Sequence, residues 1–274
     1  MFIEEDHGDP WATRSLRRDR RPVTVNADGI RVVKGRGFVD VIVPGTGRTP
    51  PLYSAQDPWT IQMEFVQRWR FYERHEFIDV RTEIEWSSYD RRVRLSFPTA
   101  MKTDRMWTEI PFGVIERERY EMQGTHWNNA SGDWPCIGWA AVEERGRGFS
   151  VLNKGTPSVR TERGVLLVSA LRSPTFPNCL EEPDCYSAPV YDGMRDAGRH
   201  VFEHRLVAYE GTWREAGLVD LAREFNQAIP AAPAIGEAPV WPFGQVPPGV
   251  IVAAVKKPRQ GRGLVLRQIG RAHV

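Results

Sequence analysis

The sequence predicts a mainly β protein: an antiparallel β-sandwich, supersandwich-like, with one short amphipathic helix near residues 213–229. Three observations predict this class. Apolar and polar residues alternate with a period of two through much of the chain, which is typical of half-buried strands. Gly- and Pro-rich turn sequences such as GDWP, RGRG and SPTFPN separate these runs. A single segment spaces its apolar residues as a helix does.

The clearest strands lie in the middle of the chain. One alternating run covers 61–71, a second covers 78–86 and a third covers 93–97. We expect the second and third to form an antiparallel hairpin through a turn at 87–90. Charges of mixed sign in RTEIEWSSYDRRVRL (81–95) indicate a solvated face there.

Further strands are predicted on both sides of this region. The segment GVLLVSALRS is apolar almost throughout, as expected for a strand buried on both faces. Residues 44–58 contain several Gly and Pro and predict a long loop. The remaining candidates are two strands within 22–43, then 109–116, 137–143, 148–153, 164–172, 199–209, 249–255 and 263–267.

The helix has both a start and a stop signal. Thr212 and Glu215 have the spacing of a capping box, in which each side chain bonds the other residue's backbone N–H. Pro230 stands where the helix should end. Between them, apolar residues recur at helical spacing at Leu218, Leu221, Ala222, Phe225 and Ile229.

We divide the chain into four segments. Residues 1–58 form entry strands and a loop of the β region, 59–229 the main β-sandwich domain, and 230–267 a Pro-rich linker with truncated C-terminal strands. Residues 268–274 read QIGRAHV, and IGRAHV back-translates to the start of a common sequencing adapter, so we expect an artefact there. The alternative is a genuine basic tail. With the artefact, the chain is part of a longer protein.

Composition excludes several classes of partner. The net charge of +2, spread in both signs, does not suggest nucleic-acid binding, and no apolar run reaches the roughly 18–20 residues of a membrane span. The three cysteines are too few for a disulfide framework. A Cys179–Cys185 bridge and free thiols both stay open. Sparse cysteine use favours a cytoplasmic location, with free thiols.

Local motifs for catalysis are absent. The sequence has no GxGxxG, no GK[ST], no HExxH, no CxxC pair and no GxSxG. His200 and His204 would share a strand face and could begin a metal site, but a structural role is favoured because no third ligand accompanies them. Asp6, His7 and Asp9 could bind a cation, although turn formation explains them better.

Several segments, in order, carry a family resemblance. They are EEDHGDPW (4–11), FYERHEFIDVRTEIEWSSYDRRVRLSFPT (71–99), TEIPFGVIER (108–117), GFSVLNKGTPSVRTERGVLLVSALRSPTFPN (148–178), DAGRHVFEHRLVAYEGTWREAGLVDLAREFN (196–226) and KPRQGRGLVLR (257–267). Together they resemble the C-terminal region of glycoside hydrolase family 38, the α-mannosidases, over most of residues 59–267. Each segment is moderately specific, and their shared order makes the resemblance strong.

The resemblance implies a division of labour. Such enzymes carry an N-terminal α/β catalytic domain, a three-helix bundle and then large β-sandwich domains. The implied retaining mechanism uses an aspartate nucleophile and a divalent metal, usually zinc, in the N-terminal domain. No motif of that domain matches this chain, so we expect no catalytic residue and no bound cofactor here. The implied partners are the N-terminal catalytic domain and an α-mannoside or related glycan.

One loop is a candidate for the rim of the substrate cleft. The resemblance implies that loops of the β domains reach the rim of the active site. The segment LRSPTFPN ends a buried strand and enters a loop of this kind. We therefore expect Arg172, Ser173, Thr175 and Asn178 to face the catalytic domain. The guanidinium of Arg172 is a rigid fork of donors that suits hydroxyl or carboxylate groups. The alternative is that Arg172 closes a salt bridge inside the sandwich.

Two other functions stay open at this point. A stand-alone carbohydrate-binding or structural β-sandwich would hold exposed aromatic and polar groups in a concave face, whereas an enzyme fragment would expose an apolar patch. If the chain is part of an enzyme of the family it resembles, the substrate could be another mannoside such as mannosylglycerate. Substrate choice lies mostly in the catalytic domain, so these residues do not decide it.

Overall fold

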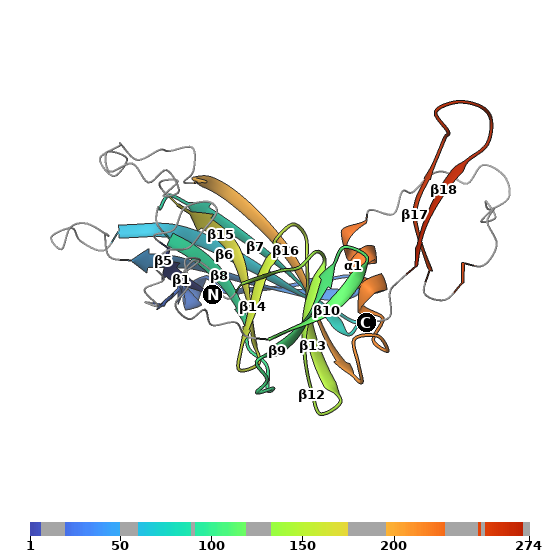
Figure 1. Ribbon diagram of the computed structural model, residues 1–274. Coiled ribbons are helices and arrows are strands. Elements are labelled where there is room, and N and C mark those ends of the chain that lie inside the picture. Colours follow the sequence, from blue (N-terminus) through green and yellow to red (C-terminus); the bar gives the residue numbers. More distant parts are fainter. Residues whose placement is uncertain are drawn as a thin grey trace, which may run out of the picture.

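The protein is built from two antiparallel sheets that face each other, followed by a separate hairpin (Figure 1). The computed structural model describes residues 1–6, 20–49, 60–88, 91–118, 133–174, 196–227, 246–247 and 250–270. Strands dominate, and within this described part the chain forms one α-helix, so the predicted mainly β class with sandwich architecture is confirmed.

The smaller sheet has six strands in the order β11-β14-β15-β8-β1-β2. Its central strand β8 pairs with β1 on one side and with β15 on the other, where a bulge falls between Ser169 and Leu171. The strand bounds are Phe2–Glu5 for β1, Arg21–Pro22 for β2, Arg91–Phe97 for β8, Trp134–Pro135 for β11, Ser158–Glu162 for β14 and Val165–Ser173 for β15.

The larger sheet has ten strands in the order β10-β9-β12-β13-β16-β7-β6-β5-β3, with β4 also paired to β5. A single 3-10 turn, η1 (Ala27–Gly29), precedes β4. The strand bounds are Thr24–Val25 (β3), Arg31–Gly35 (β4), Phe38–Thr49 (β5), Thr60–Tyr72 (β6), Phe77–Trp86 (β7), Arg105–Ile110 (β9), Gly113–Glu118 (β10), Trp139–Glu144 (β12), Arg147–Asn153 (β13) and Gly198–Glu210 (β16).

The predicted hairpin between 78–86 and 93–97 is wrong. Strand β7 pairs with β6 and β16 in the larger sheet, whereas β8 pairs with β1 and β15 in the smaller one. Both strands bury one apolar face, and these faces meet across the core instead of lying side by side. Alternation reveals which face of a strand is buried but not which strand lies next to it.

Two other boundaries differ from the prediction. The single strand expected at 109–116 is the end of β9 and the start of β10, joined by a turn in which Phe112 has a positive φ of 61°. The predicted loop at 44–58 is wrong for residues 44–49, where β5 continues to Thr49 in pairing with β6, and residues 50–58 lie outside the described residues. A Gly- and Pro-containing sequence can continue a strand when the neighbouring strand supplies its hydrogen bonds.

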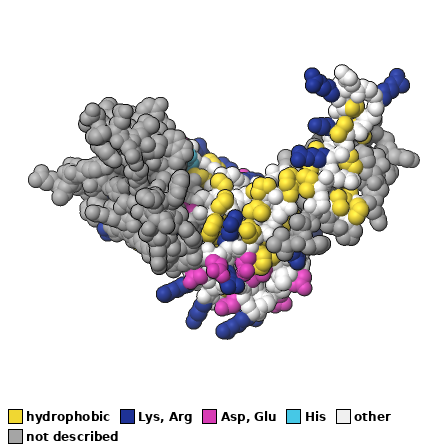
Figure 2. Space-filling model, viewed as in Figure 1, with side chains coloured by type: hydrophobic (Ala, Val, Ile, Leu, Met, Phe, Trp, Pro, Cys, Tyr) yellow, Lys and Arg dark blue, Asp and Glu magenta, His cyan; other side chains and the backbone are white. Residues whose placement is uncertain are grey.

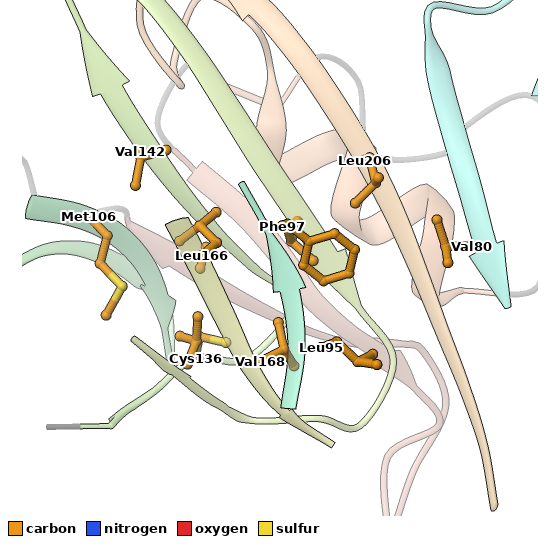
Figure 3. Close-up of a cluster of buried hydrophobic side chains, with 12 residues drawn as sticks. Val80, Leu95, Phe97, Met106, Cys136, Val142, Leu166, Val168 and Leu206 are labelled. Carbon is orange, nitrogen blue, oxygen red and sulfur yellow. The ribbon is translucent and has the colours of Figure 1, made fainter. Parts of the chain in front are cut away.

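The core lies between the two sheets. Val80 and Leu206 of the larger sheet meet Leu95, Phe97 and Leu166 of the smaller one (Figure 3). A second cluster extends the same interface around Ile3, Met63, Ile84, Trp86, Val93 and Leu171. Strands from before residue 59 supply part of both sheets, since β1 lies in one and β5 in the other.

The helix α1 (Leu218–Asn226) is shorter than predicted. The capping box forms, with the Thr212 N–H donating to Glu215 Oε2 at 2.8 Å and the Glu215 N–H to Thr212 Oγ1 at 3.3 Å. Gly217 then adopts a left-handed conformation (φ 65°), so the first turn ends and α1 begins after it. Residues 228 and 229 lie outside the described residues. The helix buries Leu218 and Ala222 against the outer face of the larger sheet.

The last strands form their own two-stranded sheet. Strand β17 (Val250–Lys256) pairs with β18 (Val265–Gly270), and the two overlap the strands predicted at 249–255 and 263–267. β18 includes three of the residues predicted as adapter-derived, and that origin stays a prediction. In Figure 2 this hairpin stands away from the sheets with Lys and Arg side chains at its outer end. No helix among the described residues is long and apolar enough to cross a membrane.

A network of buried arginines and carboxylates

Charged residues cover the outer face of the smaller sheet, opposite the core. Along β8, Val93 and Leu95 point inward, so Arg92 and Arg94 point outward, yet both arginines are fully buried. Charged side chains from neighbouring strands and from three positions that flank strands join them. We call this set the arginine network: Glu4, Asp6, Arg20, Arg92, Arg94, Asp133, Arg160, Glu162 and Arg172.

Two carboxylates hold the centre of the network. Asp133 Oδ2 accepts hydrogen bonds from Arg92 Nη1 at 2.6 Å and from Arg94 Nη2 at 2.8 Å. Asp6 Oδ2 accepts from Arg92 Nε at 3.0 Å and Nη2 at 2.7 Å. Asp6 also receives a two-pronged contact from Arg172, with Nε to Oδ2 at 2.7 Å and Nη2 to Oδ1 at 3.1 Å. Such bidentate pairs fix the guanidinium plane as well as its position.

The edge of the network is built around Glu4. Its Oε2 accepts from Arg94 Nε at 2.8 Å, and its Oε1 accepts from Arg20 Nε at 3.0 Å and Arg160 Nη2 at 3.3 Å. Arg20 Nη2 and Arg160 Nη2 both reach Glu162 Oε1 at 2.6 Å. Strands β1, β8, β14 and β15 are thus cross-linked on this face by charge-assisted hydrogen bonds.

The electrostatics keep the carboxyl groups ionised. Burial alone would raise the pKa of Asp6, but hydrogen bonds and charge from Arg172 and Arg92 lower it to about 2. Burial would likewise raise the pKa of Asp133, and the charges of Arg94 and Arg92 lower it instead. Burial would lower the pKa of Arg94, but Asp133 and Glu4 raise it above its ordinary value. These groups do not exchange protons near neutral pH, so the network is suited to holding geometry.

The network carries a positive excess. Its nine members are five arginines and four carboxylates. Burial and then the charge of Arg94 lower the pKa of both Arg92 and Arg160, as expected where cations crowd together. Within the described part of the chain, Arg94 Nη1 and Asp133 Oδ1 have no hydrogen-bond partner. A buried polar atom of this kind is costly unless water or another group meets it.

Two of the predicted rim residues lie on opposite faces of β15. Arg172 belongs to the arginine network, so a salt bridge exists, as the alternative interpretation expected, but on the outer face and not between the sheets. Ser173 is fully buried on the inner face, where its hydroxyl donates to the Ser88 carbonyl at 2.9 Å and accepts from Trp86 Nε1 at 3.0 Å. Thr175 and Asn178 lie outside the described residues, and the rim stays a prediction.

Sequence reasoning missed Arg92 and Arg94. We interpreted 81–95 as a solvated face, which fits β7, where Glu85 is exposed, but is wrong for β8. The available signal was the pattern RRVRLSF, in which arginines alternate with Val93 and Leu95 and so form one continuous face. Asp6, interpreted as a turn residue, is a buried acceptor for two arginines. His7 and Asp9 are outside the described residues.

The histidine pair does not form a metal site. His204 is fully buried, with Nε2 at 3.0 Å from Thr156 Oγ1, whereas His200 Nε2 lies 2.6 Å from the Asp196 carbonyl oxygen. Among the described residues, no three His, Cys, Asp or Glu side chains converge as metal ligands, so no metal-dependent step is assigned to them. Burial raises the pKa of Cys136 to about 12, which keeps this thiol protonated. Cys179 and Cys185 fall outside the described residues.

His204 predicts acid destabilisation. Burial lowers its pKa from 6.5 to about 4, so between these pH values the unfolded chain binds a proton that the folded chain does not. We expect the free energy of unfolding to fall by about 3 kcal/mol as the pH drops through this window. Urea denaturation at several pH values measures this change. His204→Gln should flatten the profile between pH 6.5 and about 4; an equally steep profile in the variant would contradict the assignment. Asp6 acts in a lower window, from 3.8 to about 2.

Comparison with known proteins agrees with this fold. A sequence profile described as "Glycosyl hydrolases family 38 C-terminal domain" matches residues 3–179, which is more than half of the chain and includes every member of the arginine network. The chain therefore belongs to glycosyl hydrolase family 38, in its C-terminal domain.

Named relatives are considerably longer than this chain. Alpha-mannosidase 2C1 of Mus musculus is 29% identical over 202 residues, covering 70% of this chain and 17% of the relative. The Homo sapiens protein of the same name is 28% identical over the same length, and an alpha-mannosidase of Saccharomyces cerevisiae is 25% identical over 150 residues. The chain thus spans about a sixth of the first two relatives.

A solved structure shares the fold over nearly the whole chain. The crystal structure of an alpha-mannosidase from Enterococcus faecalis V583 aligns with a TM-score of 0.75 at 16% identity, covering 97% of this chain and 32% of that one. A second family 38 structure from Enterococcus faecalis gives 0.71 at 14% identity. These likenesses show a common architecture for the two sheets.

Proposed function

We propose that this chain is the non-catalytic β-sandwich part of an α-mannosidase-like glycoside hydrolase that acts on α-mannosides. In this proposal it buttresses the catalytic domain and shapes the substrate cleft. The family match over residues 3–179 carries the proposal, supported by relatives that are named alpha-mannosidases and of which the matched region covers 17%. A stand-alone carbohydrate-binding module is not favoured, because the match is to a domain of an enzyme family.

The arginine network suits the supporting role. It fixes four strands of the smaller sheet through buried charge-assisted hydrogen bonds, and so presents a rigid outer face. A rigid face can hold a neighbouring domain in a defined orientation, which cleft geometry requires. We place both catalytic carboxyl groups and the divalent metal, zinc by family resemblance, in the catalytic domain outside this chain.

The first test is activity of the chain alone. We expect no turnover of an aryl α-mannoside by the purified 274-residue chain, with or without added zinc. Retaining hydrolysis needs two carboxyl groups about 5 Å apart across the bond, and the proposal places both in the catalytic domain. The measurement is release of the aryl alcohol, with a full-length family member as the positive control. Turnover that co-purifies with the chain would refute the non-catalytic role.

The second test concerns Arg172 as a residue at the cleft rim. In a full-length homologue, replacing the residue at this position with alanine should raise KM, lower kcat, or do both, because the guanidinium would no longer orient the loop or a hydroxyl. The matched control is Arg20→Ala, which removes another arginine of the network at its far edge. Normal kcat and KM in the Arg172 variant, or equal losses in both variants, would count against a rim role.

A further inference from the structure

The outer face of the larger sheet is only partly covered by helix. Helix α1 packs over β12 and β13, whereas β6, β7 and β16 present side chains to solvent on the same side. Register aligns these side chains in rows that cross the strands. One row contains Arg68, Arg81 and Glu203, and another, four residues along each strand, contains Glu64, Glu85 and Arg199.

Each row contains two like charges directly opposite each other. Arg68 is paired in register with Arg81, and Glu64 with Glu85. Like charges at opposed positions of neighbouring strands destabilise a sheet. Arg68 forms a long ion pair with Asp40, in which 4.0 Å separates Nε from Oδ2. Arg81 is ion-paired within the chain with Glu83 at 3.0 Å and with Glu203 at 3.3 Å, so Arg68 is the charge in this row that an external carboxylate would stabilise most.

The row between these two is partly apolar. It contains Val66 and Val201, whose exposed fractions are 41% and 42%, on either side of Glu83. Glu83 is already paired with Arg81 at 3.0 Å and with Arg199. The middle row thus combines two exposed valines with one ion-paired carboxylate, and it lies between a row with net positive charge and a row with net negative charge.

This pattern is complementary to itself. We propose that the face binds a second copy of this chain through a two-fold axis that lies along the middle row. Rotation about this axis places each strand opposite the same strand of the other copy. It places the positive outer row of one copy opposite the negative outer row of the other. Arg68 then faces Glu64 of the other copy and Arg81 faces Glu85, while Glu203 faces Arg199. All three strands contribute opposite charges across the outer rows, and Val66, Val201 and Glu83 meet their own copies, as an isologous interface requires. Each Glu83 carboxylate enters this contact already ion-paired with Arg81 and Arg199 of its own chain.

The surface has room for these side chains. A cleft of about 380 Å³ opens beside Arg68 and Arg81, and a hollow of about 320 Å³ opens beside Glu64 and Glu85. The two charged rows lie about 13 Å apart, because four strand residues span that length. This spacing exceeds the Debye length at physiological salt, roughly 8 Å, so neither row cancels the other at a distance.

Charge reversal at Arg68 separates association from stability. In Arg68→Glu the new carboxylate faces Arg81 within the chain, which removes a like-charge pair, but it faces Glu64 of the other copy. We expect little change in the stability of the folded chain, because the relief of repulsion with Arg81 is offset by the lost ion pair with Asp40. The dissociation constant of the dimer should rise about tenfold or more, measured by sedimentation equilibrium. The double variant Arg68→Glu with Glu64→Arg restores opposite charges across the interface and should return the dissociation constant to within about threefold of the original.

Lys34→Glu is the matched control. Lys34 is an exposed residue of β4, on the opposite face by register, and its reversal should leave the dissociation constant unchanged. The original dimer should also weaken as salt rises. A chain that remains monomeric at about 100 μM and low salt would overturn the proposal, as would a dimer that Arg68→Glu leaves intact or that the double variant fails to restore.

Discussion

Replacing Arg94 with alanine is expected to lower the free energy of unfolding by about 3–5 kcal/mol, one of the two largest effects anticipated for a single substitution. Arg94 is fully buried and donates to Glu4 at 2.8 Å and to Asp133 at 2.8 Å. Without it, two buried carboxylates lose a cation, and their desolvation is no longer offset. Chemical denaturation at neutral pH measures the loss.

The control for Arg94 is an exposed arginine with similar partners. Arg105 forms ion pairs with Glu118 at 2.7 Å and Glu116 at 3.9 Å, but 61% of its side chain is exposed. Arg105→Ala should change stability by roughly 0–1 kcal/mol, because water screens such pairs. Similar losses in the two variants would show that burial of the arginine network does not govern its contribution.

Replacing Trp86 with alanine should also cost about 3–5 kcal/mol. Trp86 is 1% exposed, fills the core beside Ile84 and Val93, and donates its indole N–H to Ser173 at 3.0 Å. The alanine variant leaves a cavity between the sheets that rigid strands cannot close. Thermal and urea unfolding should both report the loss, with unchanged far-ultraviolet dichroism below the transition.

A pair of phenylalanine variants separates packing from hydrogen bonding. Trp139 is equally buried, but its Nε1 has no hydrogen-bond partner among the described residues. Trp139→Phe removes an unsatisfied donor, whereas Trp86→Phe removes a satisfied one, so the second should cost about 1 kcal/mol more. If Trp139→Phe is the more damaging change, the Trp86–Ser173 hydrogen bond contributes little to stability.

Local patterns in the sequence predicted the strands well. The alternation in 199–209 and the apolar run in 164–172 correspond to β16 and β15, and the capping box at Thr212 forms as expected. These features depend on residues close in sequence, whose geometry repeats every two residues in a strand. The helix is shorter because Gly217 takes a left-handed conformation at its start, which glycine permits but does not require, and because Gln227 is extended at its end.

The candidate site was only partly visible in the sequence. Arg172 was singled out, but its partner Asp6 lies 166 residues away, and nothing local predicts that pairing. Arg94 and Asp133 carry charges that would ordinarily be solvated, so their low side-chain exposures of 0% and 9% could not be predicted from residue type. The family resemblance supplied the class of domain, and the profile match confirmed it.

The sequence by itself determined which segments are strands, which face of each strand is apolar, and which family the chain belongs to. Only the tertiary structure decided that β7 and β8 lie in different sheets, and that the charged face of β8 is buried. The physical reason is that periodicity is a property of neighbouring residues. Strand partners and buried ion pairs are chosen by the free energy of the whole packed chain.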